Sequence, residues 1–235
     1  MTTDISQIAE ARASQWLLLE RVRREQESAS DTLPYARDRA TVTISRECGA
    51  GGHTVAAKLL ERLGPEWRIW DREIVDEIAR SAKVRSAFVE GFDEHTLSRA
   101  EQTIRYLANY WGLSPDRYYK HLVEVLISIG HQGKTIIIGR GANFVLPRAL
   151  KVRLCASESY RTHVIRDRDA ITEAEARLKI HQFDNERASF ARTMFGKQID
   201  DPIEYDIVMR TDRLTTDAVA ASLCAAVNEH IHSLV

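Results

Sequence analysis

The sequence feature that most limits the possible folds is a β-branched segment, residues 41–45 (TVTIS), that runs into a glycine-rich turn and then a helical segment. The turn contains Gly49, Gly51 and Gly52, and the helical pattern HTVAAKLLERL ends before Gly64. A strand, a glycine turn and a helix in this order present several backbone N–H groups and the positive helix end to an anion. We therefore predict a phosphate-binding loop at this junction. An ordinary tight turn is the alternative, because such turns also use glycine.

The turn departs from the standard P-loop pattern G-x-x-x-x-G-K-[ST]. Gly52 stands where the pattern has the lysine that reaches the β- and γ-phosphates, and Arg46 stands where it has its first glycine. Either phosphoryl transfer has been lost or another cation replaces the lysine, and Arg46, His53 and arginines later in the chain are the candidates. A hydroxyl for magnesium is expected from Thr54, one place past the motif position, or from Ser45, although each could equally be a helix-cap or strand residue.

Strands and helices alternate along the rest of the chain. Strands are predicted at residues 68–70, 134–138, 152–156 and 205–211. Helices are predicted over 71–83, about 93–131, 172–195 and 215–232, the third of them beginning with a capping box of Thr172 and Glu175. The isoleucines at 136–138 are typical of a strand buried on both faces, whereas Arg153 fits that template less well. This alternation predicts an α/β fold, a three-layer arrangement in which helices flank a parallel sheet.

Residues 1–40 precede this domain. An amphipathic pattern predicts a helix over about residues 4–28, followed by a polar linker that contains Pro34. The helix could be a partner surface that forms a homodimer, and packing against its own domain is the simpler interpretation. We therefore divide the chain into a helix and linker, 1–40, and a single α/β domain, 41–235, of ordinary globular composition.

Composition excludes several classes of function. The formal net charge of −1 argues against a polyanionic partner, so no nucleic acid is expected. No apolar stretch is long enough to span a membrane and no signal peptide opens the sequence, so we expect no membrane partner and a cytoplasmic protein. The three cysteines form no paired motif, which fits a reducing compartment. Cys48, inside the glycine turn, is either a redox-sensitive thiol or a small residue packed beneath the phosphates.

Four separated segments resemble the cytidylate kinase-like family. They are SRECGAGGHTVA, WDREIVDEIA, IIIGRGANFVLP and DNERASFARTMFG…DDPIEYDIVMRTDRLT. Members of this branch of the nucleoside monophosphate kinases commonly carry an SR-x-x-G-x-GG loop without the P-loop lysine. The resemblance covers about residues 41–232. It implies a P-loop kinase core of parallel strands, a helical nucleoside-monophosphate-binding insertion at about 71–131 and a mobile lid at about 172–200.

The resemblance also implies roles for individual residues. ATP with Mg²⁺ is expected at the glycine turn, at Ser45, Arg46, Gly49, Ala50, Gly51, Gly52, His53 and Thr54, with Thr54 as the magnesium contact. The acceptor nucleotide is expected at Asp71, Arg72, Arg140, Asn143 and Asp184. Catalysis is expected from Arg140, Arg187 and Arg192, because fixed cations neutralise the charge of the phosphoryl group in transfer.

The acceptor motif departs from the family pattern in one place. Arg140 resembles the arginine of an Arg-Asp pair with which orthodox cytidylate kinases hold the acceptor's phosphate and cytosine, but Gly141 occupies the place of the aspartate. The choice of base is therefore open, although the Asn143 amide offers contacts. In the lid, Asp184 and Arg187 are neighbours at i, i+3 on a helix, whereas Arg192 points partly elsewhere.

The expected function is that of a magnesium-dependent nucleoside monophosphate kinase with CMP or dCMP as acceptor. One alternative is a nucleotide sensor or scaffold that kept the anion cradle but lost transfer, and another is a kinase for a non-nucleotide small molecule on the same core. The lid arginines favour an enzyme, because a sensor has no need of charges directed at a transition state.

Overall fold

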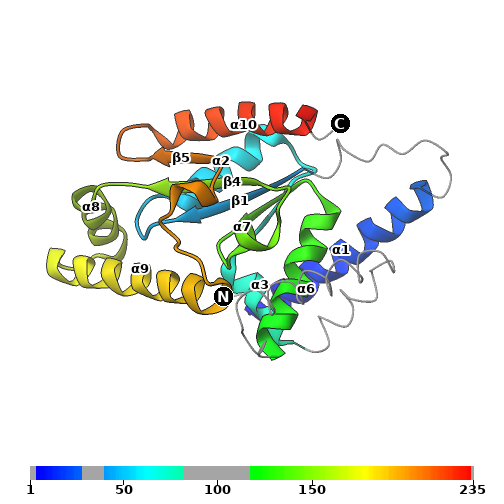
Figure 1. Ribbon diagram of the computed structural model, residues 1–235, viewed down its shortest axis with the longest axis horizontal. Helices are drawn as coiled ribbons and strands as arrows, with labels where there is room; N and C mark the ends of the chain where they lie inside the picture. Colours follow the sequence, from blue (N-terminus) through cyan, green and yellow to red (C-terminus); the bar gives the residue numbers. More distant parts are fainter. Residues whose placement is uncertain (1–3, 28–39, 82–116, 234–235) are drawn as a thin grey trace.

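A parallel sheet forms the centre of the protein (Figure 1). The computed structural model describes residues 4–27, 40–81 and 117–233. Within these residues the strands follow the spatial order β2 (Arg68–Trp70), β3 (Thr135–Ile138), β1 (Thr41–Arg46), β4 (Leu150–Cys155) and β5 (Ile207–Arg210). All neighbouring strands are parallel, and helices flank the sheet, so the predicted α/β fold is confirmed.

The first strand of the domain lies in the middle of the sheet. β1 pairs with β3 on one side, with Thr41 opposite Thr135, and with β4 on the other, with Arg46 opposite Leu154. Ligands of open parallel sheets bind outside the carboxyl ends of the strands, at the point where the strand order reverses. The glycine turn follows β1 directly, so it lies at this point of the sheet.

Two helices cover one face of the sheet, and the contact is apolar. They are α2 (Gly52–Leu63) and α10 (Thr216–Ser233), which lie side by side over the strands (Figure 1). Alternate residues of the central strands point into this layer, namely Val42, Ile44, Ile136, Ile138, Val152 and Leu154. Gly64 ends α2, as predicted, in a backbone conformation with a positive φ of 101°.

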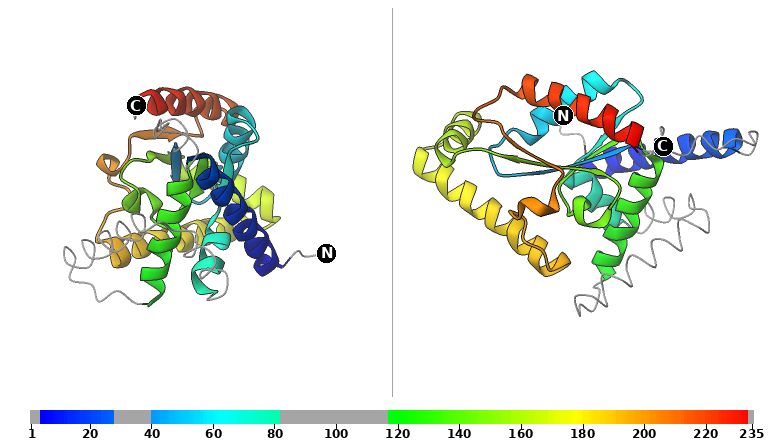
Figure 2. Two further views of the ribbon diagram at one scale, coloured as in Figure 1. Left: turned by 90° about the vertical axis from the view of Figure 1, so that its right-hand side faces the viewer. Right: turned by 45° about the horizontal axis from the view of Figure 1, so that its top comes forward.

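The other face is covered by α3 (Arg72–Arg80), α6 (Arg117–Gln132) and the short α7 (Ala142–Val145), which share an apolar cluster with Ile137 and Phe195. The N-terminal helix α1 (Ile5–Glu27) joins this layer, because its Ala9 and Ala13 are buried in the same cluster and it packs along α3. The first turns of α1 therefore pack against the domain, while its later turns extend away from it (Figure 2).

The segment after β4 contains two helices that pack against each other at one end of the sheet (Figure 1). α8 (Glu158–Asp169) was not predicted from the sequence, since its buried positions include Arg161 and Thr162 and give little apolar periodicity. α9 (Glu173–Phe195) begins with the predicted capping box of Thr172 and Glu175. A 3₁₀ turn, η2 (Pro202–Glu204), then leads into β5.

Part of the expected acceptor-binding insertion, residues 82–116, lies outside the described residues. The expected lid coincides with α9 and the turn that follows it. None of the helices in the described part of the chain is long and apolar enough to cross a membrane.

Candidate active site

The glycine turn after β1 has a backbone that only glycine adopts without strain. Gly49 and Gly51 have φ of 84° and 72°, in the left-handed region. A Cβ on Gly49 would also lie 2.9 Å from the Arg161 carbonyl oxygen, so α8 packs directly against the loop. Both glycines are therefore needed for the loop's path, and Gly49 is also needed for the close contact with α8.

The start of α2 carries backbone donors without acceptors. Gly51 is the N-cap residue of α2 and supplies no side-chain cap. Among the described residues, no acceptor receives the N–H groups of Gly51, Gly52 or His53. An uncapped helix start after a glycine turn is an anion-binding arrangement, since free N–H groups and the helix dipole favour a negative charge.

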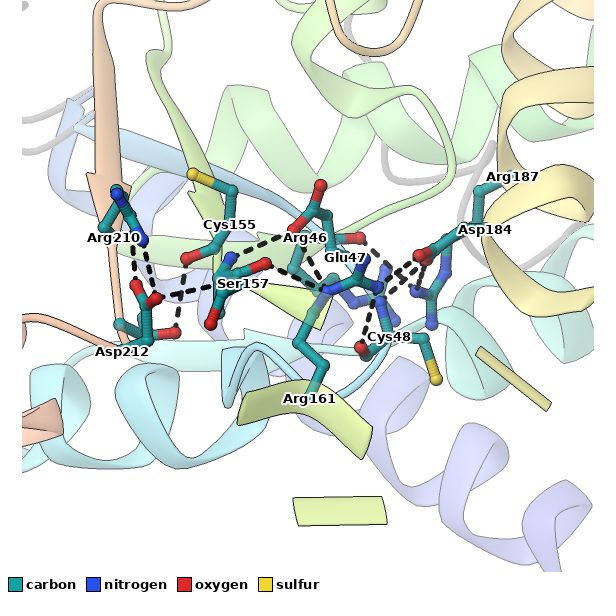
Figure 3. Close-up of polar contacts among 12 residues, drawn as sticks. Arg46, Glu47, Cys48, Cys155, Ser157, Arg161, Asp184, Arg187, Arg210 and Asp212 are labelled. Carbon is teal, nitrogen blue, oxygen red and sulfur yellow. Dashed lines mark hydrogen bonds and ion pairs between the residues drawn. The ribbon is translucent and has the colours of Figure 1, made fainter. Parts of the chain in front are cut away.

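One loop N–H is already bound to a negative charge, that of Asp184 on α9. The Cys48 N–H donates to Asp184 Oδ1 at 2.8 Å, and Arg161 Nη1 lies 2.5 Å from Asp184 Oδ2 (Figure 3). Arg187 Nη1 contacts both Asp184 Oδ1, at 3.3 Å, and the Arg46 carbonyl oxygen, at 3.4 Å. The predicted i, i+3 pair of Asp184 and Arg187 is therefore present, and it fastens α9 to the loop.

Arg161 is a residue of this site that the sequence analysis missed. Its guanidinium is nearly buried and donates to the carbonyl oxygens of Ala156, at 3.0 Å, and Cys48, at 3.3 Å, besides its ion pair with Asp184. Glu47 lies 3.4 Å from Arg161 and accepts the Ala156 N–H, which joins the ends of β1 and β4 (Figure 3). Arg161 thus holds the loop, β4 and α9 together.

Removing the Arg161 guanidinium should destabilise the fold. Arg161→Ala removes the donor to Asp184 Oδ2 and the side-chain donor to two carbonyl oxygens, so we expect the free energy of unfolding to fall by about 2 to 3 kcal/mol. Urea denaturation measures this change. Arg177→Ala is the matched control, because Arg177 is exposed and its pairs with Glu158 and Glu173 are surface pairs that contribute little to stability. Equal losses in the two variants would contradict the role of Arg161.

A cavity of about 310 Å³ lies between the ends of β1 and β3 and the side of α9. Its lining includes four arginines that the sequence analysis singled out, Arg46, Arg72, Arg140 and Arg187, together with Ser45 and Asn143. Phe144, Phe190, Glu186 and the backbone of Gly139 and Gly141 complete most of the wall. The cavity is therefore strongly cationic, with aromatic rings on one side.

Three of the side chains around the cavity have buried donors with no acceptor among the described residues. These atoms are Arg140 Nε, Asn143 Nδ2 and Arg187 Nε. Buried donors without partners are rare in folded proteins because each costs free energy. Three of them on residues that line one cationic cavity make this cavity a candidate site for an anion.

Comparison with known proteins decides the family. The model described as "Cytidylate kinase-like family" matches residues 41–213. The chain belongs to the cytidylate kinase-like family. A cytidylate kinase of Pyrococcus horikoshii is 23% identical over 193 residues, 82% of this chain and 90% of that protein. A cytidylate kinase of Methanoculleus marisnigri is 34% identical over 101 residues, 42% of this chain and 56% of that protein.

The fold is also found in a solved structure. An uncharacterized protein from Eubacterium ventriosum superposes with a TM-score of 0.63 at 19% identity, covering 81% of this chain and 99% of that one. Membership in the cytidylate kinase-like family supports a nucleotide kinase-like function and implies nucleotide substrates.

The acceptor motif of this cytidylate kinase-like protein has a structural reason for its missing aspartate. Gly141 has φ of 67°, and a Cβ at this position would overlap the ring of Phe195. The carboxylate beside Arg140 comes instead from Asp76 of α3, which forms an ion pair with the Arg140 guanidinium. Arg140 also lies over the Phe190 ring, 4.9 Å from its centroid. Asp76 is a site residue that the sequence analysis missed, although a carboxylate among the buried residues of an amphipathic helix was a signal.

Other predicted residues lie at the edge of the site. Asp71 is the N-cap of α3 and accepts the Ile74 N–H at 3.0 Å, while the neighbouring Arg72 lines the cavity. His53 and Thr54 are exposed on the first turn of α2, and Ala50 is buried beneath the loop. Desolvation and the charge of Arg46 lower the pKa of His53, which disfavours its charged form.

Two predicted site residues are not available to a ligand in the cavity, one because of its position and the other because its hydroxyl group is already hydrogen-bonded. Arg192 is exposed on α9 and is not part of the cavity wall, so the structure does not bring it together with Arg140 and Arg187. The Ser45 hydroxyl accepts from Arg153 Nη1 at 2.8 Å and lies 3.2 Å from the Tyr205 hydroxyl. Arg153, the residue that fitted the strand template poorly, is therefore buried with polar partners.

Cys48 is buried, which favours its interpretation as a packing residue. It is 6% exposed and packs with Ile165, Ala176 and Ile180 of α8 and α9. Burial raises the pKa of its thiol, although the charge of Arg187 opposes this shift. We expect iodoacetamide near pH 7 to alkylate Cys48 at least about tenfold more slowly in the native protein than in the guanidinium-unfolded chain. Peptide mass spectrometry measures the two rates, and equal rates would restore the redox interpretation.

Proposed function

We propose that the protein is a nucleoside monophosphate kinase that transfers the γ-phosphoryl group of ATP to CMP or dCMP. The observation that carries this proposal is the set of unpaired donors on Arg140, Asn143 and Arg187 around a cavity next to an uncapped glycine loop. Such a pair of adjoining anion sites suits a reaction that must bring two phosphate groups together.

The loop is the site for the phosphates of the donor nucleotide. Its free N–H groups at Gly51, Gly52 and His53 can bind phosphate oxygens directly, without the desolvation of a side chain. Asp184 holds the Cys48 N–H in the same loop. A nucleotide that uses the Cys48 N–H must therefore displace this carboxylate, which couples nucleotide binding to the position of α9.

The cavity is the site for the acceptor phosphate and the transferred group. Arg140 is held by Asp76 and the Phe190 ring, so its guanidinium is fixed before any ligand arrives. Arg187 reaches from α9 to the end of β1, between the loop and the cavity. Phosphoryl transfer depends mainly on alignment and charge neutralisation, which fixed arginines supply. A contribution from Arg192 requires a different position of α9.

Magnesium fits this arrangement as a partner of the nucleotide. Mg²⁺ in kinases is bound mostly by substrate phosphates and water, with only one or two protein ligands. Thr54, exposed on the first turn of α2, is the hydroxyl that remains for it, since the Ser45 hydroxyl is engaged by Arg153 and Tyr205. When bound, the metal would neutralise charge on the β- and γ-phosphates.

A panel of nucleoside monophosphates tests the proposal. ADP release in a coupled assay with ATP and Mg²⁺ should be fastest with CMP or dCMP, and it should require the acceptor. Turnover with another base keeps a monophosphate kinase but rejects the choice of cytosine. Measurable ATP binding without turnover on any acceptor would reject the kinase and favour the sensor. Turnover that persists in both Arg140→Ala and Arg187→Ala would reject the site.

A further inference from the structure

The two departures from the P-loop pattern are in contact in the structure. Arg46 stands at the position of the first glycine, and Gly52 stands at the position of the lysine. A Cβ on Gly52 would lie 2.9 Å from Arg46 Cγ and 3.3 Å from Arg46 Cβ. The aliphatic part of Arg46 therefore fills the space in which a lysine at position 52 would begin. A side chain at position 52 therefore requires Arg46 to leave this conformation.

A third glycine accommodates the head of the same side chain. Gly139, at the end of β3, has φ of 80°, and a Cβ there would overlap Arg46 Nη1. The Arg46 side chain thus runs from the end of β1, across Gly52, to Gly139, where it becomes part of the cavity wall. The missing Cβ of Gly52 leaves room for the aliphatic part of Arg46, and the missing Cβ of Gly139 leaves room for Nη1 in this position.

The Arg46 guanidinium is buried without a counter-ion. The residue is 9% exposed, and no carboxylate in the described part of the chain forms an ion pair with it. Among the described residues its charged neighbours are Arg187, Arg72 and Arg140, with Glu73 as the one opposing charge, and burial together with the charge of Arg187 lowers the pKa of Arg46 to about 10. It therefore stays charged at neutral pH. A buried charge among like charges is costly unless a ligand supplies the opposite charge.

We propose that Arg46 replaces the P-loop lysine, so that its guanidinium binds the β- and γ-phosphates of the donor nucleotide from between Gly52 and Gly139. This inference rests on the proposed function, because it assigns a residue within the donor site. A guanidinium binds two phosphate oxygens at once through a planar pair of donors, whereas a lysine offers a single charged amine. The loop thus keeps the single positive charge that the lysine has in the standard motif. Here the charge comes from the first position of the motif, residue 46, instead of from position 52.

Nucleotide binding to the full-length protein tests the role of Arg46. Isothermal titration calorimetry compares ADP with AMP, which lacks the β-phosphate. Arg46→Ala should weaken ADP binding by about 10- to 100-fold and leave AMP binding within about twofold. The melting temperature of Arg46→Ala should be equal to or higher than that of the wild type, because an unpaired buried charge has been removed. Arg62→Ala, an exposed arginine of α2, is the control and should change neither affinity nor stability.

A reciprocal exchange tests the steric link between the two positions. Gly52→Lys alone should lower the melting temperature, because the new side chain collides with Arg46. Arg46→Gly with Gly52→Lys restores the first glycine and the lysine of the standard motif, with His53 still in the place of its hydroxyl residue, and should recover both stability and the preference for ADP over AMP. The recovery is the decisive result, since each single variant by itself could fail through misfolding.

The outcomes separate the two proposals. If the wild type binds neither ADP nor AMP, the proposed function and this inference are both overturned. If the wild type prefers ADP and Arg46→Ala keeps that preference, the function stands and the assignment of Arg46 is overturned. If the double variant has the same melting temperature and the same ADP preference as Gly52→Lys alone, the inference that Arg46 takes the place of the lysine is overturned.

Discussion

Replacing Arg187 by alanine is expected to lower kcat by about 10³-fold, with a much smaller change in KM. Arginines that stabilise the transition-state charge of phosphoryl transfer are worth about 10³- to 10⁵-fold in rate. Arg187 suits this role because its Nε has no acceptor within the described residues, while Nη1 is held by Asp184 and the Arg46 carbonyl oxygen. The guanidinium is therefore oriented between the loop and the cavity before substrates bind.

Two variants control the Arg187 experiment. Arg187→Lys keeps the charge but loses the planar pair of donors, so it should recover only part of the rate. Arg192→Ala removes an exposed arginine from the same helix, and a change in stability within about 0.5 kcal/mol is expected there. Steady-state kinetics with the best acceptor of the panel measures kcat for all three variants. Urea denaturation measures the stability of Arg192→Ala. Equal losses of kcat at Arg187 and Arg192 would show that α9 moves and that the cavity wall seen here is not the catalytic arrangement.

The second large effect is expected at Gly141. Gly141→Ala should lower the free energy of unfolding by about 2 to 5 kcal/mol. A left-handed backbone costs a residue with a Cβ about 1 to 2 kcal/mol, and overpacking adds about 1 to 3 kcal/mol. Phe195 cannot move aside easily, since it is fully buried and its ring contacts those of Phe144, Phe190 and Tyr119.

Gly64→Ala provides the matched control for Gly141. Gly64 also has a positive φ, 101°, but a Cβ there meets nothing within 4 Å, so only the backbone strain of about 1 to 3 kcal/mol is expected. Urea denaturation measures both variants. If Gly141→Ala costs no more than Gly64→Ala, Phe195 does not explain the missing aspartate, and Gly141→Asp would then be a reasonable route to the orthodox pair.

The local patterns of the sequence were sufficient for most of the fold. Glycine-terminated runs of β-branched residues, the isoleucines at 136–138 and the capping box at Thr172 and Glu175 each predicted an element that the structure contains. α8 was not predicted, because it packs through polar contacts of Arg161 as well as through Ile165. Its apolar residues therefore lack the 3.6-residue spacing that is typical of a surface helix.

The site was predicted in part, for a related reason. Arg46, Arg72, Arg140, Asn143 and Arg187 belong to motifs, and the cavity brings all five together. Their partners come from distant positions that no local pattern connects, as Asp76 on α3 does for Arg140. Arg153 fitted the template of a buried strand less well because it is charged, and its partners, Ser45 and Tyr205, are remote in sequence. Sequence motifs therefore identified the charges that line the cavity, and only the structure showed which groups hold them.

The central place of β1 has a consequence for how the protein is made. β1 lies near the start of the domain, yet it pairs only with strands that begin after residue 130, as Thr41 with Thr135 and Val42 with Leu150 show. Such non-local pairing slows folding, because loop closure must precede the contacts that repay it. During synthesis, β1 therefore remains without its strand partners until more than half of the chain has emerged from the ribosome. The glycine loop that follows β1 therefore reaches its final conformation only when the sheet has formed.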